Sequence, residues 1–249
     1  MPTHEWDGAS YDRISGPQLA MGRAVLDRLR LAGGETVLDA GCGSGRVTEE
    51  LLARLPRGRA IGVDQSASMI RAARERLGER VELRQADLLE LELPQPLDAI
   101  FSTATFHWIS DHELLFRRLH AALRPGGQLV AQCGGEGNIE QLRGVAHEIL
   151  ARAPYAEHFA DWRAPWNYAS PQATRERLAR AGFAQADCWL APAPQQPEQP
   201  REFLSTIVLG PHVEHLPAEL RESFMDDVLA ALGEPVVVDY VRLNIDAVA

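Results

Sequence analysis

Three glycines alternate along a short stretch that joins a predicted buried strand to a helix. Residues 37–45 read VLDAGCGSG, with glycine at positions 41, 43 and 45. Glycines let the main chain turn tightly and approach a ligand closely, and the helix start that follows presents free N–H groups and a positive dipole end. The stretch therefore predicts a binding site for a nucleotide-like or carboxylate-bearing ligand.

The spacing of these glycines also bears on which nucleotide is bound. The dinucleotide fingerprint is G-x-G-x-x-G, and counting from Gly41 and Gly43 its third glycine would fall on Arg46, whereas the sequence has Gly45. This mismatch weakens the interpretation as a nicotinamide dinucleotide site. An NAD(P)-dependent oxidoreductase of the Rossmann type stays open as an alternative.

Three acids, Asp39, Asp64 and Asp87, each end one of three consecutive predicted strands. In a doubly wound sheet the carboxyl ends of neighbouring strands meet at one crevice. Asp64 lies where the ribose of an adenosine offers its hydroxyls, and Asp87 is placed to accept from the exocyclic amine of adenine. The ordered acids indicate an adenosine-containing ligand more strongly than the glycines alone.

The elements that must position these residues alternate in type. Short β-rich runs separated by helix-length segments are typical of right-handed βαβ units with parallel strands. The first half of the chain is thus expected to form a doubly wound α/β sheet. The predicted helices cover 17–31, 45–55, 66–77 and 111–123, and the predicted strands cover 36–39, 59–64, 80–86, 98–103 and 127–133.

The second half is less regular. We predict helices over 138–152, 171–181, 201–209 and 217–232, strands over 183–190 and 236–243, and a proline-rich connector over 191–200. The simplest arrangement is one sheet with a helical cap inserted near its end. Aromatic residues of the cap would then lie over the carboxyl edge of the sheet.

The order of the motifs resembles that of class I S-adenosylmethionine-dependent methyltransferases. The resemblance covers about residues 10–135 and is carried by 37–45, Asp64, 87–88 and the LRPGG of 123–127. Within that superfamily the chain is similar to the trans-aconitate methyltransferase group, which esterifies carboxylic acids. That second similarity is carried by Tyr11, 104–109 and 111–112.

This resemblance implies a Rossmann-like methyltransferase fold with a doubly wound, seven-stranded, mostly parallel sheet and a helical cap inserted toward the C-terminus. Residues 1–249 would form a single domain. Its parts would be a cofactor-binding core (1–135), cap and substrate-side elements (136–182 and 192–234) and closing strands (183–191 and 235–249).

The implied cofactor is S-adenosyl-L-methionine, with S-adenosyl-L-homocysteine as product. Asp39 and the Gly41 carbonyl would hold the ammonium group, Asp64 the ribose diol, and Asp87 with Leu88 the adenine. The full set of cofactor-binding residues expected from the resemblance is Tyr11, Asp39, Gly41, Cys42, Gly43, Gly45, Asp64, Gln65, Met69, Asp87, Leu88, Ser102 and Thr103.

The acceptor is expected to be a small molecule, with O-methylation of a carboxylic acid by in-line displacement favoured. A carboxylate is ionised at neutral pH and needs no general base, whereas a phenol, amine or carbon acid generally does. His107 is therefore assigned a binding or base role, left open, beside Trp108 as a wall of the acceptor pocket. C- or N-methylation of a metabolite and a non-catalytic cofactor-binding module are alternatives.

Four residues of the expected cap could reach the acceptor. Trp162, Trp166 and Tyr168 either line the acceptor site or fasten the cap to the sheet. Arg163 among them could make a bidentate contact with an acceptor carboxylate, whereas a solvent-facing position is the default for one of 25 arginines.

Composition excludes several classes of chemistry. All 25 basic residues are arginine, so the chain cannot form a pyridoxal phosphate Schiff base or supply a Walker A lysine. A net charge of −10 disfavours nucleic acid and anionic membrane surfaces as partners. The three scattered cysteines predict no disulfide framework or metal site and fit a cytoplasmic protein, and no stretch is apolar enough to cross a membrane.

Overall fold

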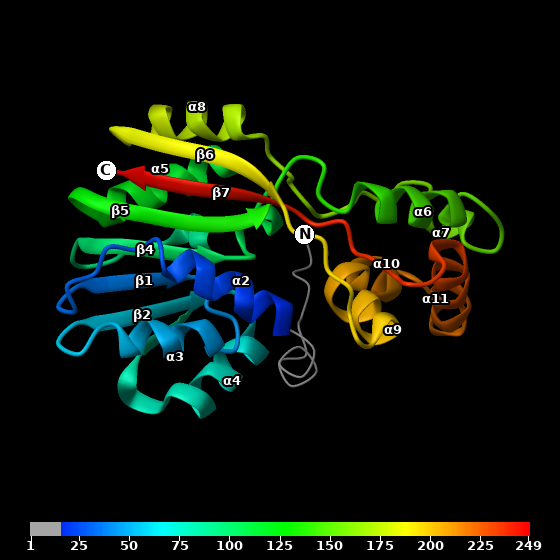
Figure 1. The fold of residues 1–249 in the computed structure, drawn as a ribbon, viewed down its shortest axis with the longest axis horizontal. Coiled ribbons are helices and arrows are strands. Elements are labelled where there is room, and N and C mark those ends of the chain that lie inside the picture. The colour runs from blue at the N-terminus through cyan, green and yellow to red at the C-terminus, as the bar shows by residue number, and fades with distance from the viewer. Residues whose placement is uncertain (1–15) are drawn as a thin grey trace.

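A computed structural model describes residues 16–249 and contains one seven-stranded sheet in the order β3-β2-β1-β4-β5-β7-β6 (Figure 1). The first five strands in the chain pair in parallel, whereas β7 is antiparallel to both β5 and β6. The strands are β1 Thr36–Ala40, β2 Arg59–Asp64, β3 Glu82–Gln85, β4 Leu97–Thr103, β5 Leu123–Gly134, β6 Gln185–Pro192 and β7 Val241–Val248. The predicted mostly parallel, doubly wound α/β sheet is confirmed.

Helices cover both faces of this sheet and form a cap beside it. The longer ones are α2 Gly16–Leu26, α3 Arg46–Ala53, α4 Ala67–Leu77, α5 His112–Ala122, α6 Glu140–Leu150, α8 Pro171–Ala181 and α11 Ala218–Leu232. The shorter ones are η1 Gly78–Arg80, η2 Leu88–Glu90, η3 Phe106–Trp108, α7 Ala156–Phe159, α9 Pro200–Phe203, η4 Leu204–Val208 and α10 Gly210–His215.

The two faces of the sheet follow from the alternation of side chains along each strand. Val37 points into a buried cluster shared with α2, α3 and α4, whereas its neighbour Leu38 points into a second cluster shared with α5 and α8. Both clusters consist of buried aliphatic and aromatic side chains, so helices must cover both faces. This sandwich leaves the carboxyl ends of the parallel strands as the rim where loops and cap meet.

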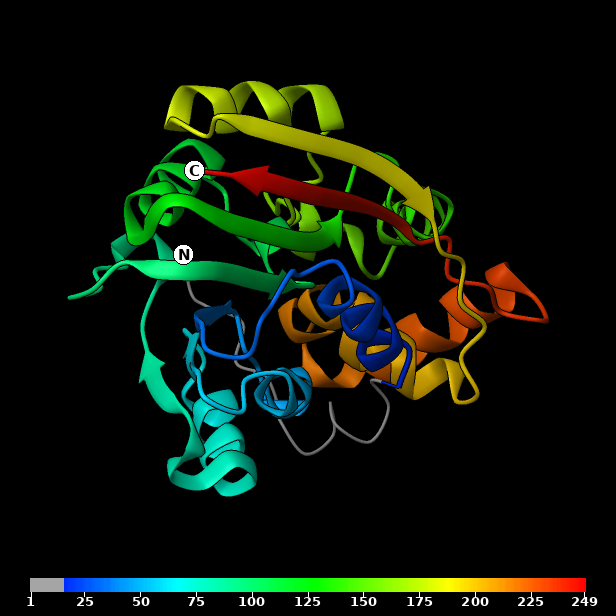
Figure 2. The same ribbon diagram turned by 60° about the vertical axis from the view of Figure 1, so that its left-hand side comes forward.

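The cap has an apolar core of its own, built from α6, the segment Phe203–Leu209, α11 and the chain that precedes β7. It lies beyond the carboxyl ends of the strands (Figure 1). By contrast α8, the last helix of the segment 136–182, packs on α5 and β6 and covers the sheet, as Figure 2 shows.

The predicted helix 201–209 is confirmed as a continuous helical stretch, α9 followed by a π-helix. Three boundary predictions were wrong. The predicted helix 17–31 ends at Leu26, and the predicted strand 127–133 begins at Leu123. The last strand begins at Val241, not at 236, because Val236, Val238 and Tyr240 pack into the core of the cap. Within 16–249 no helix is long and apolar enough to cross a membrane.

Candidate active site

The glycine turn after β1 is held against the neighbouring strands. The backbone N–H groups of Gly41 and Cys42 both donate to the Val63 carbonyl of β2, at 2.8 and 3.0 Å. Gly41 has φ +83°, and a Cβ there would lie 2.1 Å from Thr105 Oγ1 after β4. The turn therefore requires glycine at this position, both for its conformation and for the close approach.

Asp64, at the end of β2, bonds the glycine turn through one carboxylate oxygen and the start of α4 through the other. Oδ2 accepts a hydrogen bond from the Gly43 N–H at 3.0 Å, and Oδ1 accepts one from the Ser66 N–H at 2.9 Å. A Cβ at Gly43 would meet no atom within 4 Å, so the main chain borders open space at this point. A ligand can thus approach both the backbone of the turn and the carboxylate.

Asp39 lies beneath this turn and is buried. Its Oδ2 accepts a hydrogen bond from Thr48 Oγ1 at 2.7 Å. Burial raises the pKa of Asp39 to about 7; the charge of Asp64 acts in the same direction, and the bond from Thr48 opposes both. A cation placed nearby would favour the ionised carboxylate.

Asp87 ends the segment after β3 and caps a short helix. Its Oδ1 accepts from the Leu89 N–H at 2.8 Å, which leaves its other oxygen to a ligand. Leu88 beside it is buried and lines the same cavity. These three acids and the glycine turn meet at one rim, as the strand order predicts.

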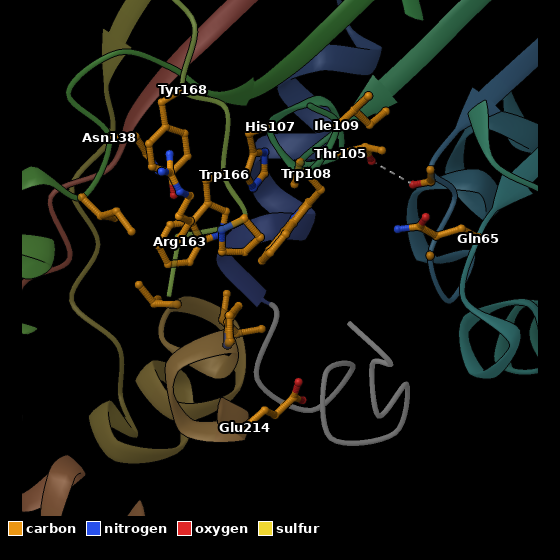
Figure 3. Close-up of a pocket in the computed structure, with 18 of the residues that line it drawn as sticks. Gln65, Thr105, His107, Trp108, Ile109, Asn138, Arg163, Trp166, Tyr168 and Glu214 are labelled. Carbon is orange, nitrogen blue, oxygen red and sulfur yellow. Dashed lines mark hydrogen bonds between the residues drawn. The ribbon is translucent and has the colours of Figure 1, made fainter. Parts of the chain in front are cut away.

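A cavity of about 890 Å³ begins at this rim and extends to the cap. At the sheet end it is lined by most of the residues predicted to bind a cofactor, and at the cap end by the predicted acceptor-side residues (Figure 3). The predicted residues that line it are Gly41, Gly43, Asp64, Gln65, Met69, Asp87, Leu88, Thr103, His107, Trp108, Trp162, Arg163, Trp166 and Tyr168.

Four predicted cofactor residues that the structure describes, Asp39, Cys42, Gly45 and Ser102, do not line this cavity. Asp39 and Cys42 border a smaller adjoining space of about 70 Å³. Gly45 serves packing, because a Cβ there would lie 2.7 Å from Leu77, and Ser102 donates its hydroxyl to the Ala40 carbonyl at 2.6 Å. For Gly45 and Ser102 the structure thus provides a structural role instead, while Tyr11 lies outside the described residues.

His107 lies on η3, just after β4, with 8 % of its surface exposed. The Gly134 N–H of β5 donates to its Nδ1 at 3.3 Å. Burial, followed by the positive charges of Arg242 and His112, holds the pKa of His107 well below its ordinary value. The imidazole is therefore neutral and carries its proton on Nε2.

An aromatic cluster surrounds this histidine on the cap side of the cavity (Figure 3). His107 stacks on Tyr168 with ring centroids 5.8 Å apart, and Tyr168 is parallel within 7° to Trp166 at 5.9 Å. Trp108 meets Trp166 edge-on at 6.0 Å. Trp166 and Tyr168 thus lie together with His107 and Trp108 on one wall, whereas Trp162 packs against His212 and Phe159.

Asn167 holds this wall in place. Its backbone N–H donates to the His107 carbonyl at 2.8 Å, and its side-chain amide donates to the Ser110 carbonyl at 3.0 Å.

Two residues that line the cavity have strained backbone conformations. Ala104 has φ near +53° and Ile139 has φ near +52°. Non-glycine residues adopt such angles only where the surroundings impose them, and these positions cluster at functional sites.

Arg242 on β7 is a site residue that the sequence did not reveal. It lines the cavity, yet only 4 % of its surface is exposed, and its Nε has no hydrogen-bond partner. Its guanidinium lies 5.5 Å from the ring centre of Tyr240, and no acid within 16–249 forms an ion pair with it. Its strand, VRLNIDAV, also carries Asn244 and Asp246, so the sequence offered no signal that singles out Arg242.

Comparisons with known proteins agree on the class of fold and reaction. A family model described as a methyltransferase domain matches residues 37–127. The chain is 32 % identical to trans-aconitate 2-methyltransferase of Acidovorax sp. over 93 % of this chain and 90 % of that enzyme. It is 37 % identical to the enzyme of the same name from Paracidovorax citrulli, over 64 % of this chain and 61 % of the relative.

A solved structure shares the fold at lower identity. Phosphoethanolamine N-methyltransferase 2 of Haemonchus contortus was solved with phosphomonomethylethanolamine and S-adenosylhomocysteine. It superposes with a TM-score of 0.62 and 19 % identity, covering 97 % of this chain and 56 % of that chain.

Proposed function

Because the chain belongs to the class I S-adenosylmethionine-dependent methyltransferases and is similar to the trans-aconitate methyltransferases, we propose that it methylates a carboxylate oxygen of a small organic acid. The cofactor is S-adenosylmethionine, so the nicotinamide alternative is set aside. The observation that carries the carboxylate assignment is Arg242, a buried cation in the cap half of the cavity without an acidic partner among the described residues.

A buried guanidinium without an anion is costly, because the interior replaces little of its lost hydration. An acceptor carboxylate would compensate that cost through charge-assisted and often bidentate hydrogen bonds. A neutral phenol or an ammonium group would leave the cation uncompensated or repel it. Arg242 therefore favours an anionic acceptor over C- or N-methylation of a neutral or cationic metabolite.

His107 fits the same acceptor as a donor. With Nδ1 engaged by Gly134, the remaining ring nitrogen can donate its N–H to a carboxylate oxygen. A neutral histidine already protonated on that nitrogen cannot remove a proton through it, and an ionised carboxylate has none to lose. We assign His107 to binding and orientation, not to general base catalysis.

The sheet end of the cavity fits the cofactor. The turn at Gly41 and Gly43 would receive the amino-acid portion above the buried Asp39, Asp64 the ribose diol, and Asp87 with Leu88 the adenine. S-adenosylmethionine supplies an activated methyl group when bound. The chain's own residues align the acceptor with it and exclude water, a contribution that reaches about 7–11 kcal/mol in well-oriented reactions.

The test is turnover with a panel of acceptors. The purified chain would be incubated with S-adenosylmethionine and a set of organic acids, a phenol and an amine, and products measured by mass spectrometry. We expect the acids alone to be methylated, with methyl ester and S-adenosylhomocysteine formed in equal amounts. Methylation of the phenol or amine without any ester would overturn the assignment, as would tight S-adenosylhomocysteine binding with no turnover of any acceptor.

A further inference from the structure

The cap half of the cavity is mostly apolar, although it must accommodate an anion. Its inner polar groups are few, namely His107, Asn138 and Arg242. The apolar and aromatic residues that line this half are Trp108, Ile109, Ile139, Trp162, Pro165, Trp166, Tyr168, Ile207, Val208, Pro211 and Tyr240.

Charge is distributed unevenly along this half. Arg242 is its buried cation, whereas Arg163, the other arginine that lines it, is exposed. Three exposed acids also line the cavity. Glu157 and Asp161 lie just before Arg163 in the chain, and Glu214 lies on α10. In Figure 3 Glu214 lies far from Tyr168 and His107. Among the described residues the interior therefore offers one place for a carboxylate, at Arg242.

An aromatic wall lies beside Arg242. Trp166 stacks on Tyr168 with ring planes parallel within 7°, and Tyr168 stacks on His107 with the planes at 30°. Flat aromatic surfaces bind planar apolar groups well, by area burial and offset stacking. An acceptor whose carboxylate meets Arg242 would lay the rest of its body along these rings.

We propose that the natural acceptor carries a single carboxylate on a flat, apolar body, such as an aryl-substituted acid, and that polycarboxylates are poor acceptors. This inference rests on the proposed function. A second or third carboxylate would lose its hydration against indole rings with no second buried cation among residues 16–249 to receive it, or would face the exposed Glu157 and Asp161. The substrate in the relatives' name, trans-aconitate, carries three carboxylates and thus does not match this lining.

The test compares acids of related shape that differ in charge and apolar area. Crotonate and cinnamate carry one carboxylate without and with a phenyl ring, fumarate carries two and trans-aconitate three. At about pH 8 and saturating S-adenosylmethionine, kcat/KM for cinnamate is expected to exceed that for crotonate by about 10- to 100-fold, as expected for burial of a phenyl ring. Fumarate and trans-aconitate are expected at least about tenfold below crotonate.

A pair of variants links this preference to the aromatic wall. Trp166→Leu is expected to reduce the cinnamate-to-crotonate ratio about tenfold or more, with S-adenosylhomocysteine affinity unchanged. Trp189→Leu is the matched control, because Trp189 lies on β6 against the Arg28 guanidinium and does not line the cavity. It should keep the parent's ratio.

The outcomes separate the two proposals. If trans-aconitate or fumarate is esterified with higher kcat/KM than cinnamate, the single-carboxylate inference is wrong while carboxylate methylation stands. If Trp166→Leu keeps the full preference for cinnamate while it binds S-adenosylhomocysteine, the aromatic wall is not what selects the acceptor. If no acid is esterified and another acceptor class is methylated, both proposals fall.

Discussion

The backbone N–H of Gly134 donates to His107 Nδ1 across adjacent strand ends of β5 and β4, at 3.3 Å. This one bond decides the chemistry of the histidine, because it leaves the proton on Nε2 and makes that nitrogen a donor. Burial and the charge of Arg242 act in the same direction by keeping the ring neutral. A general base would need the opposite arrangement, with a free lone pair facing the acceptor.

Replacing His107 by Gln tests this assignment. The Gln amide can still donate, so we expect kcat to fall by less than about tenfold, whereas loss of a general base costs about 10²–10⁴-fold. Since the pKa of His107 lies well below 6.5, kcat of the parent at saturating cofactor and acceptor should show no ionisation of this group between pH 6 and 8. An acidic limb that is present in the parent's kcat profile and absent from the variant's, together with a defect of about 10³-fold, would restore the role of base.

Arg242 offers a prediction in which stability and activity change separately. Arg242→Met removes the buried charge but keeps much of the side-chain volume. We expect kcat/KM for the acid to fall about 10²- to 10³-fold, as for loss of a buried ion-pair partner, while the free protein becomes no less stable. Steady-state kinetics and urea unfolding measure the two effects.

A surface variant serves as the control for Arg242. Arg124→Met removes an arginine that pairs with Asp98 at an exposed position, so kcat/KM should be unchanged. If Arg242→Met instead lost stability and kept its KM for the acid, Arg242 would be a structural residue.

Asp64 is predicted to be central to cofactor affinity. Asp64→Ala removes the charged acceptor proposed for the ribose diol, so S-adenosylhomocysteine should bind about 1.5–3 kcal/mol more weakly, roughly 10- to 150-fold, by titration calorimetry. Because the carboxylate also accepts from the Gly43 N–H of the turn and from the Ser66 N–H at the start of α4, the control must also remove a carboxylate that accepts a backbone hydrogen bond.

Asp98→Ala is that control. The Asp98 carboxylate also accepts a hydrogen bond from the backbone, from the Thr36 N–H at 2.7 Å, but Asp98 does not line the cavity. Its loss should lower stability and leave S-adenosylhomocysteine affinity within about twofold of the parent. An Asp64 variant that binds equally well would place the ribose elsewhere.

The cofactor half of the site was predictable because its signals are local. Gly41 requires glycine for reasons visible in its own turn, and Asp39, Asp64 and Asp87 meet because parallel strands bring their carboxyl ends to one rim. Ordered glycines and strand-end acids therefore carry positional information without knowledge of the three-dimensional structure.

The acceptor half was only partly predictable because its residues come from distant segments. Arg242 reaches the cavity through β7, whose start was predicted five positions too early, at 236 instead of Val241. The valine-rich run before it favours a strand by propensity, but it lies outside the sheet, with Val236 and Val238 buried in the core of the cap and Val237 exposed. Tertiary packing thus decided both the register of the last strand and the direction in which its arginine points.

The buried Asp39 predicts a pH dependence of cofactor affinity. Its pKa is about 7 in the free protein, so it is largely protonated below that pH. If Asp39 stabilises the cofactor ammonium, binding requires the carboxylate, and the Kd for S-adenosylhomocysteine should rise by up to about tenfold per pH unit from pH 7 to 5. Calorimetry in buffers of different ionisation enthalpy should detect one proton released per molecule bound below pH 7.

The same raised pKa has an opposite effect on the stability of the free protein. The folded state holds the Asp39 proton up to pH 7, whereas the unfolded chain releases it near pH 4. The retained proton therefore stabilises the folded state fully below pH 4. This stabilisation is lost as the pH rises through 7, and the free energy of unfolding falls by up to about 1.4 kcal/mol per pH unit. Asp39→Asn removes the titrating group, so both pH dependences should flatten together. If urea unfolding and cofactor titration of the variant follow the parent's pH profiles, another group is responsible for them.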